Sequence, residues 1–228
     1  RRIQEILGPI PEERADGVGR QRASQFRQRV CRRNSDGRLL QGQPDQAVGI
    51  AVGNGLQVAA GIYDFEPGLG SQVANLAAAG HTVRGNDVAG TTAEGVAEAK
   101  TIAEAVGDAD VVITMLPNGA ILRQVAEEAV AHMAAGALLI DCSTVDVESA
   151  RFAAEAAQKA GLLFVDAPVS GGIGGAQAGS LTFMVGGSEE AFAAARPILE
   201  GMGKAVIHAG DAGAGQTAKI CNHMLLAI

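Results

Sequence analysis

The chain is 228 residues long, 47% of them apolar and 19% charged, with a formal net charge of −7. This composition excludes a chain disordered throughout, because it supplies enough apolar side chains for a buried core. The length allows one ordinary domain with an appendage or part of a second domain, and excludes two complete large domains. No apolar run reaches the roughly 18 residues of a membrane span and no signal peptide is visible, so we expect no membrane partner. We expect a cytoplasmic protein, or a mitochondrial matrix protein in a eukaryote.

The first 45 residues are chemically unlike the rest. They hold ten Arg, no Lys and six acidic residues, whereas residues 46–228 hold eight basic and nineteen acidic residues. Few apolar residues recur there at a helical or strand period, so we expect residues 1–60 to be a basic arm, disordered or not native to the fold. Basic arms can bind phosphates, but the acidic remainder offers no basic face. We therefore expect no nucleic-acid partner.

Beyond residue 46, short apolar runs alternate with Ala-rich stretches. The predicted strands are Val83–Asp87, Val111–Leu116, Ala137–Asp141, Leu162–Val165, Leu181–Val185 and Ala205–His208. The predicted helices are 71–80, 93–107, 120–134, 146–160, 188–202 and 214–228. This alternation implies right-handed βαβ units, so we predict an α/β fold with a doubly wound, mainly parallel, Rossmann-like sheet. Such sheets bind ligands at the carboxyl ends of their strands.

The cysteines and histidines do not form recognisable sites. Cys31, Cys142 and Cys221 lie too far apart in the sequence for a disulfide framework or a CxxC metal site, so we expect them to be reduced. The four histidines show neither HxxxH nor HExxH spacing. We therefore expect no metal.

A glycine pair precedes the helix predicted at 71–80. Gly68-Leu69-Gly70 matches part of the dinucleotide fingerprint G-x-G-x-x-G, but its third glycine is absent. Asp87 follows Gly70 by 17 residues and ends the next predicted strand, where a carboxylate can bind the adenosine ribose. An ordinary turn explains the glycines equally well. The pair alone therefore leaves cofactor binding open.

Two later segments resemble the signature motifs of the β-hydroxyacid dehydrogenases. Residues 166–187, DAPVSGGIGGAQAGSLTFMVGG, are similar to the substrate-binding motif of that family. Residues 210–223, GDAGAGQTAKICNH, are similar to its GxxGxGxxxKxxxN catalytic motif. With GHTV, ITMLP and DCST, the resemblance covers residues 68–228. It implies a Rossmann-like domain over 61–212 and the start of a connecting helix over 213–228, where the fold is truncated before the family's C-terminal helical domain.

The resemblance also implies an activity. We expect NAD-dependent oxidation of 3-hydroxyisobutyrate to methylmalonate semialdehyde, a step of valine breakdown. NADP is less favoured, because the Asp87 carboxylate would repel a 2′-phosphate. Two alternatives stay open: a related enzyme such as a tartronate semialdehyde or glyoxylate reductase, and a non-catalytic fragment that binds a dinucleotide. The implied partners are a small β-hydroxyacid and, for a full-length chain, further copies of itself.

The resemblance assigns the catalytic and substrate-binding residues. Lys219 is the expected general acid/base, whose pKa burial and a cationic nicotinamide would lower. The Ser170 hydroxyl and the Gly171 and Gly172 amides offer donors for a substrate carboxylate, to which Lys219 is also expected to bind. The family has Asn four residues after its Lys. Here His223 holds that position with Asn222 beside it, and we expect both in the catalytic site, an exposed helix histidine being the alternative for the former.

The resemblance further assigns the cofactor site. Its expected residues are Gly68, Leu69, Gly70, Asp87, Leu116, Pro117 and Thr144. The alternatives are a turn residue for Pro117 and a helix cap for Thr144. The family pattern has nine steps from its second glycine to a following Asn, whereas Gly70 and Asn75 are five apart. Four residues and the third glycine are therefore missing from this loop.

Overall fold

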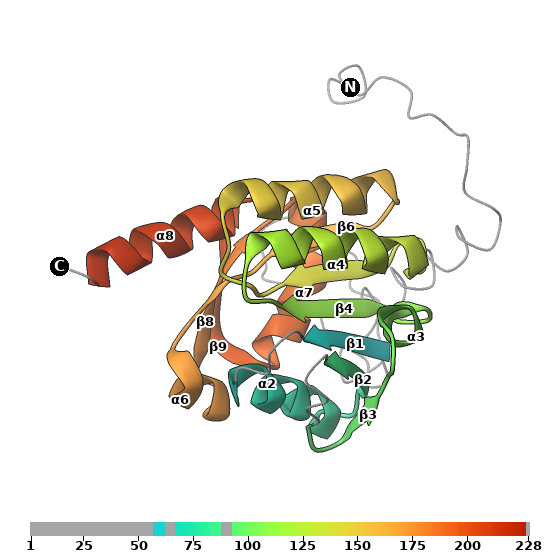
Figure 1. Cartoon of the computed structure of the whole chain (residues 1–228). Helices are drawn as coiled ribbons and strands as arrows, with labels where there is room; N and C mark the ends of the chain where they lie inside the picture. The colour runs from blue at the N-terminus through green and yellow to red at the C-terminus, as the bar shows by residue number, and fades with distance from the viewer. Residues whose placement is uncertain (1–56, 63–66, 88–92, 227–228) are drawn as a thin grey trace, which may run out of the picture.

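The computed structural model describes residues 57–62, 67–87 and 93–226 (Figure 1). Cys31 and most of the expected basic arm lie outside the described residues, but residues 57–60 belong to the first strand. The strands are β1 (Gln57–Ile62), β2 (Thr82–Asp87), β3 (Val96–Glu98), β4 (Val111–Met115), β5 (Leu138–Asp141), β6 (Leu163–Asp166), β7 (Val169–Ser170), β8 (Leu181–Gly186) and β9 (Gly203–Gly210). The helices are α2 (Pro67–Ala78), α3 (Ile102–Val106), α4 (Gly119–His132), α5 (Val147–Lys159), α6 (Gly172–Gln177), α7 (Glu189–Glu200) and α8 (Ala214–Leu226).

All described strands belong to one sheet, in the order β3-β2-β1-β4-β5-β6-β8-β7, with β9 beside β8. The strands from β3 to β6 are parallel to their neighbours, and β8 then runs antiparallel to β6. The predicted doubly wound, mainly parallel sheet is therefore confirmed. The direction in which the chain winds reverses between β1 and β4. The carboxyl ends of these two strands form the switch point at which such sheets bind ligands.

The central strands are apolar throughout because both of their faces are covered. Val111 and Ile113 of β4 face one cluster of buried side chains, and Val112 between them faces the other. Since successive side chains of a strand point to opposite faces, a strand buried on both sides reads as a continuous apolar run. Helices α3, α4 and α5 cover one face, and α2 and α7 cover the opposite face (Figure 1).

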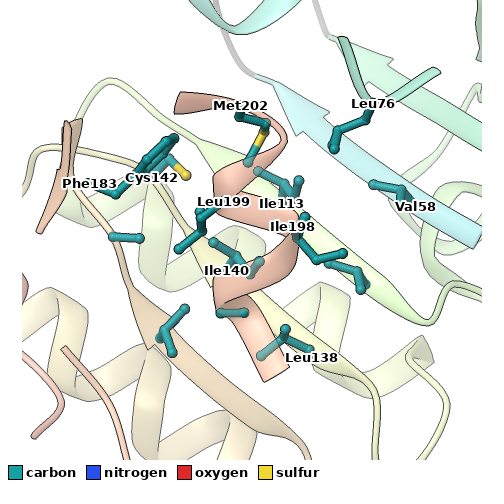
Figure 2. Close-up of a cluster of buried hydrophobic side chains, with 14 of the residues drawn as sticks. Val58, Leu76, Ile113, Leu138, Ile140, Cys142, Phe183, Ile198, Leu199 and Met202 are labelled. Atoms are coloured by element: carbon teal, nitrogen blue, oxygen red, sulfur yellow. The ribbon is translucent and has the colours of Figure 1, made fainter. Parts of the chain in front are cut away.

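Helix α7 shows how closely these layers pack (Figure 2). Its Ile198 and Leu199 lie among Ile113 of β4 and Ile140 of β5, and all four side chains are almost completely buried. Burying an aliphatic side chain of this size contributes about 1.5–3 kcal/mol. The α7 face is therefore a main source of the stability that holds the strand ends in place.

Three sequence predictions are corrected by the structure. The predicted helix at 93–107 is wrong: β3 and the short α3 replace it, because Val96 pairs with Val83 of β2 and this tertiary pairing overrides the helix propensity of the Ala and Glu residues. Strand β1 lies partly inside the predicted arm, and its Ala-Ala-Gly centre carries no β-branched signal. Helix α2 begins at Pro67 and not at residue 71, since proline is tolerated at a first helical position.

Among the described helices, none combines the length and the apolar character that crossing a bilayer requires.

Candidate active site

Lys219 lies on α8 and is buried, with 6% of its surface exposed. Its Nζ atom donates a hydrogen bond to the backbone carbonyl of Val169 on β7, at 2.5 Å. Burial lowers the pKa of Lys219, because removing water disfavours the charged ammonium. The structure therefore offers an amine that is turned inward and deprotonates more easily than a surface lysine.

Two further expected residues come together beside this amine. The Asn222 side chain, three residues after Lys219 on α8, donates from Nδ2 to the Ser170 hydroxyl at 3.4 Å. Ser170 directly follows Val169 on β7, so a single short strand contacts both α8 side chains. His223, by contrast, is exposed on α8. The position beside Ser170 belongs to Asn222.

The turn after Ser170 needs glycine. Gly171 has a φ of +136° and Gly172 a φ of +60°, both in the region that L side chains rarely adopt. A Cβ atom on Gly171 would also approach Leu181 Cδ2 to 2.9 Å. Helix α6 starts directly after Gly171 without a side-chain cap. The backbone N–H groups of its first turn therefore lie next to Ser170 without intrahelical acceptors.

Asp166, at the end of β6, holds the beginning of α8. Its Oδ1 accepts the backbone N–H of Gly213 at 2.7 Å, and its Oδ2 accepts that of Gln216 at 2.9 Å. Burial raises the pKa of Asp166 to about 6, and these two hydrogen bonds oppose the rise. A carboxylate at a helix N-terminus also complements the helix dipole. The sequence analysis gave Asp166 no role, although it is the first residue of the motif at 166–187 and ends an apolar run.

The glycines of the catalytic motif allow α8 to touch the sheet. A Cβ atom on Gly215 would lie 2.4 Å from the Met184 carbonyl and 2.6 Å from the Asp166 carbonyl. A Cβ atom on Gly186 of β8 would lie 2.7 Å from the Gly215 nitrogen. No side chain fits at either position without moving backbone. The contact fixes the first turn of α8 and, one turn later, Lys219.

The expected cofactor residues lie on the carboxyl edge of the sheet. Asp87 ends β2 and pairs in register with Ile62, the last residue of β1. Gly68, Leu69 and Gly70 lie within the first turn of α2 and not in a loop before it. Beside a switch point, helix N–H groups can donate to a pyrophosphate, and a carboxylate can accept hydrogen bonds from the ribose hydroxyls. The arrangement therefore fits a nicotinamide dinucleotide, although the third glycine is missing.

Two further expected cofactor segments meet through Ser143. The Leu116 backbone N–H donates to the Ser143 hydroxyl at 2.8 Å, which in turn donates to Asp141 at 2.5 Å. Pro117, which follows Leu116, and Thr144, which follows Ser143, are both exposed. Thr144 is not the cap of α5, because Asp146 accepts the Ser149 N–H at 2.8 Å in that role. The two loops thus lie side by side at the edge of the sheet.

Asp141, the last residue of β5, has a buried carboxyl group, as Asp166 does. It is the register partner of Asp166 on the neighbouring strand, and both are fully buried. Burial raises the pKa of Asp141 to about 6, against hydrogen bonds from Ser143 and Thr114 that lower it. Cys142, next to it, is a free thiol in the core, and Cys221 is a free thiol on the surface of α8. These cysteines lie outside the group formed by Lys219, Ser170 and Asn222.

Comparisons with known proteins find similarity over most of the chain. Residues 69–210 match the family model described as the NAD-binding domain of 6-phosphogluconate dehydrogenase. A 3-hydroxyisobutyrate dehydrogenase of Pseudomonas aeruginosa is 50% identical over 167 residues, which are 70% of this chain and 56% of the relative. An NAD-dependent L-serine dehydrogenase of the same organism is 52% identical over 124 residues, which are 52% of this chain and 41% of the relative. The chain thus spans about half the length of the curated relatives it matches.

A solved structure agrees with these relatives. The 3-hydroxyisobutyrate dehydrogenase of Mycobacterium tuberculosis, in a structure with L-serine, is 45% identical with a TM-score of 0.71, over 75% of this chain and 60% of that chain. Residues 69–210, which match the family model, include Asp87 and the segment of Val169 and Ser170. The chain therefore belongs to the β-hydroxyacid dehydrogenase family and contains the nicotinamide-dinucleotide-binding domain of that family.

Proposed function

We propose that the protein oxidises 3-hydroxyisobutyrate to methylmalonate semialdehyde with NAD, as in valine breakdown. The observation that carries this proposal is the buried Lys219 amine, which lies against β7 beside Ser170 and Asn222. Oxidation of an alcohol removes a hydride from carbon and a proton from oxygen, so the protein must supply a base. The named activity of the Pseudomonas and Mycobacterium relatives supports this substrate.

Lys219 is the proposed base. In its neutral form it takes the hydroxyl proton of the substrate, and in the reverse direction its ammonium returns that proton. The lowered pKa of Lys219 increases the neutral fraction near physiological pH. NAD, when bound at the switch point, would supply the acceptor for the hydride. The Val169 carbonyl favours the ammonium once the proton has arrived, because it accepts a hydrogen bond and cannot donate one.

The substrate carboxylate is proposed to bind at the turn after β7. The Ser170 hydroxyl and the backbone N–H groups of Gly171 and Gly172 supply donors without a side chain in the way. In its ammonium form, from which the reverse reaction starts, Lys219 adds a positive charge to this end of the site. Asn222 orients the Ser170 hydroxyl through their hydrogen bond and can reach the substrate hydroxyl from the same helix face.

The cofactor is proposed to be NAD, with NADP less favoured. Backbone groups at Gly68, Leu69 and Gly70 would bind the pyrophosphate, and Asp87 would bind the ribose hydroxyls. The loops at Leu116, Pro117 and Thr144 would bind the nicotinamide half. A carboxylate at the end of β2 supports NAD, because it repels the additional phosphate of NADP.

L-serine is a second candidate substrate. It shares a carboxylate and a 3-hydroxyl group with 3-hydroxyisobutyrate, so the same groups of the site would bind it. One relative is named for L-serine oxidation, and the structure of the Mycobacterium relative is one with L-serine.

The test measures NADH formation from NAD with 3-hydroxyisobutyrate and with L-serine. In the reductive direction, it measures NADH consumption with tartronate semialdehyde. Turnover fastest with 3-hydroxyisobutyrate supports the proposal, and turnover fastest with another substrate replaces it by that reaction. A parallel titration follows NADH fluorescence. Binding of NADH without turnover of any substrate would leave a non-catalytic dinucleotide-binding domain.

The assembly and location are also proposals. Met224, Leu225 and Leu226 at the end of α8 expose more than half of their surface, which supports burial against further copies in a full-length homo-oligomer. We propose a cytoplasmic location for a bacterial source and a mitochondrial matrix location for a eukaryotic one.

A further inference from the structure

Gln216 is a completely buried polar residue on α8, one turn before Lys219. Its side chain leaves its own helix and reaches the segment between β5 and α5. The Nε2 group donates to the Ser143 carbonyl at 2.7 Å, and Oε1 accepts the Val145 N–H at 3.2 Å. The two partners are the residues on either side of Thr144. The Gln216 amide thus binds two residues that lie more than seventy positions before it in the sequence.

The backbone of Gln216 is held from a second strand. Its N–H donates to Asp166 at the end of β6, while its side chain binds the segment that follows β5. The same segment also contacts the end of β4, since the Ser143 hydroxyl accepts the Leu116 N–H. A continuous set of hydrogen bonds therefore joins the Leu116 and Thr144 loops to the helix that carries Lys219.

The chemistry of the contact selects glutamine. The site presents one carbonyl and one N–H group, and a side-chain amide supplies the matching donor and acceptor. A glutamate at this position has no donor for the Ser143 carbonyl at neutral pH. A methionine has the length but forms neither bond with comparable strength. A buried polar group without its partner costs about 1–3 kcal/mol, so either change leaves backbone groups of the loop or the side chain unsatisfied.

We infer that Gln216 is a positioning residue, which sets the place of Lys219 relative to the Thr144 loop. This inference rests on the proposed function, because it gives a purpose to the distance between the base and the loop assigned to the nicotinamide. Gln216 does not contact the reacting atoms. It acts through the first two turns of α8 and through the backbone on both sides of Thr144.

The experiment measures the chemical reactivity of Lys219 in the chain itself, without turnover. Lysines are acetylated with trace acetic anhydride across a pH series, and the modified peptides are quantified by mass spectrometry. Exposed Lys204 is the internal reference. The variants are Gln216→Glu and Gln216→Met. The control is Thr217→Ala, which changes the next residue of α8 on its exposed side and removes only a bond to the Gly213 carbonyl.

We expect the acetylation midpoint of Lys219 in both Gln216 variants to move up toward that of an ordinary lysine. Its plateau rate should rise by about threefold or more, while Lys204 and the Thr217→Ala chain stay unchanged. NADH should bind several-fold more weakly to the Gln216 variants, since the Thr144 loop loses two hydrogen bonds. Gln216→Met preserves side-chain length and helix propensity, so it carries the test if Gln216→Glu does not fold.

An unchanged Lys219 profile in folded Gln216→Met would overturn the inference, as would an equal change at Lys204 that reveals general loosening. These outcomes are separate from the fate of the proposed function. A wild-type chain without dehydrogenase activity would refute the proposed reaction, and the acetylation profiles would still decide whether Gln216 positions Lys219.

Discussion

The amine of Lys219 and the carbonyl of Val169 are joined by a hydrogen bond of 2.5 Å between α8 and β7. Two opposing effects act on the amine there. Burial favours its neutral form, whereas a carbonyl acceptor favours the ammonium. The pKa of Lys219 is lowered, so burial prevails. Because Ser170 is the next residue of β7, the bond places a readily deprotonated amine beside a hydroxyl donor.

Replacing Lys219 tests its role as the base. In a fusion of this chain to the C-terminal part of the Pseudomonas relative, Lys219→Ala should lower kcat by about 10²-fold or more, the usual contribution of a placed acid/base group. NADH affinity, measured by fluorescence titration, should change little. Lys204→Ala is the matched control, since Lys204 is exposed on β9. Activity within about threefold of the unchanged protein would remove Lys219 from the chemistry.

Asn222 and His223 are neighbours on α8, but we expect only Asn222 to contribute to the site. Asn222→Ala should reduce kcat/KM about tenfold, because the Ser170 hydroxyl loses its hydrogen-bond partner. His223→Ala should leave kcat/KM within about twofold, since the His223 side chain is exposed. Steady-state kinetics in the same fusion measure both. The reverse ranking would show that the substrate hydroxyl is bound at the His223 position.

The charge at the end of β2 should decide the cofactor. Asp87→Arg should weaken NADH binding by about 1.5–3 kcal/mol, the range for a hydrogen bond to a charged group, and strengthen NADPH binding relative to it. Fluorescence titration of this chain with both reduced cofactors measures the ratio. Glu98→Arg, an exposed change on β3, makes the same charge change as a control. An unaltered ratio in Asp87→Arg would place the ribose elsewhere.

The contact between α8 and the sheet should tolerate no methyl group at Gly215. Gly215→Ala places a Cβ atom against the Met184 and Asp166 carbonyls, so the free energy of unfolding should fall by about 1–3 kcal/mol. Gly174→Ala on α6 is the matched control, because no atom lies within 4 Å of its added Cβ. That change should be neutral or stabilising by up to about 1 kcal/mol through helix propensity. Urea denaturation measures both, and equal effects would contradict the close contact.

The buried Asp141 carboxyl group should make stability depend on pH. Its pKa in the folded state is about 6 and its ordinary value is 3.8, so the folded protein binds more protons between these values. The free energy of unfolding should therefore fall as pH rises through this window, by about 3 kcal/mol from Asp141 at 1.36 kcal/mol per pKa unit. Above the folded pKa this contribution is constant.

Asp141→Asn should remove this part of the slope. The comparison uses the pH dependence and not the absolute stability, because an amide also alters the bonds from Thr114 and Ser143. Asp166 contributes a slope of the same sign in both chains. The Asp141 charge is a minor cause of the raised pKa of Asp166, so the Asp166 slope should also become somewhat smaller in Asp141→Asn, and both changes act in the same direction. Urea denaturation at a series of pH values provides the curves. Parallel curves for the two chains would show that Asp141 does not titrate in this window.

The strongly periodic parts of the fold were predictable from local sequence. The apolar run at Val111–Leu116 needed no tertiary information, because burial on both faces leaves its signal in neighbouring residues. The motif from Asp166 to Gly172 was recognised through its resemblance to the family, which also needs only the sequence. The edge strand β3 and the central strand β1 were not predictable in this way. Their pairing with β2 decides their conformation, and no local preference for extended structure reveals it.

The candidate site was likewise predictable in part. Sequence by itself determined the kinds of groups that the chain carries: a lysine after a glycine turn, a serine before two glycines, and an acidic residue after a strand. Only the tertiary structure decided that Lys219 is buried against Val169, that Asn222 and not His223 meets Ser170, and that Asp166 and Gln216 hold α8. These contacts join residues about fifty or more positions apart, and such distances are set by the packing of whole elements.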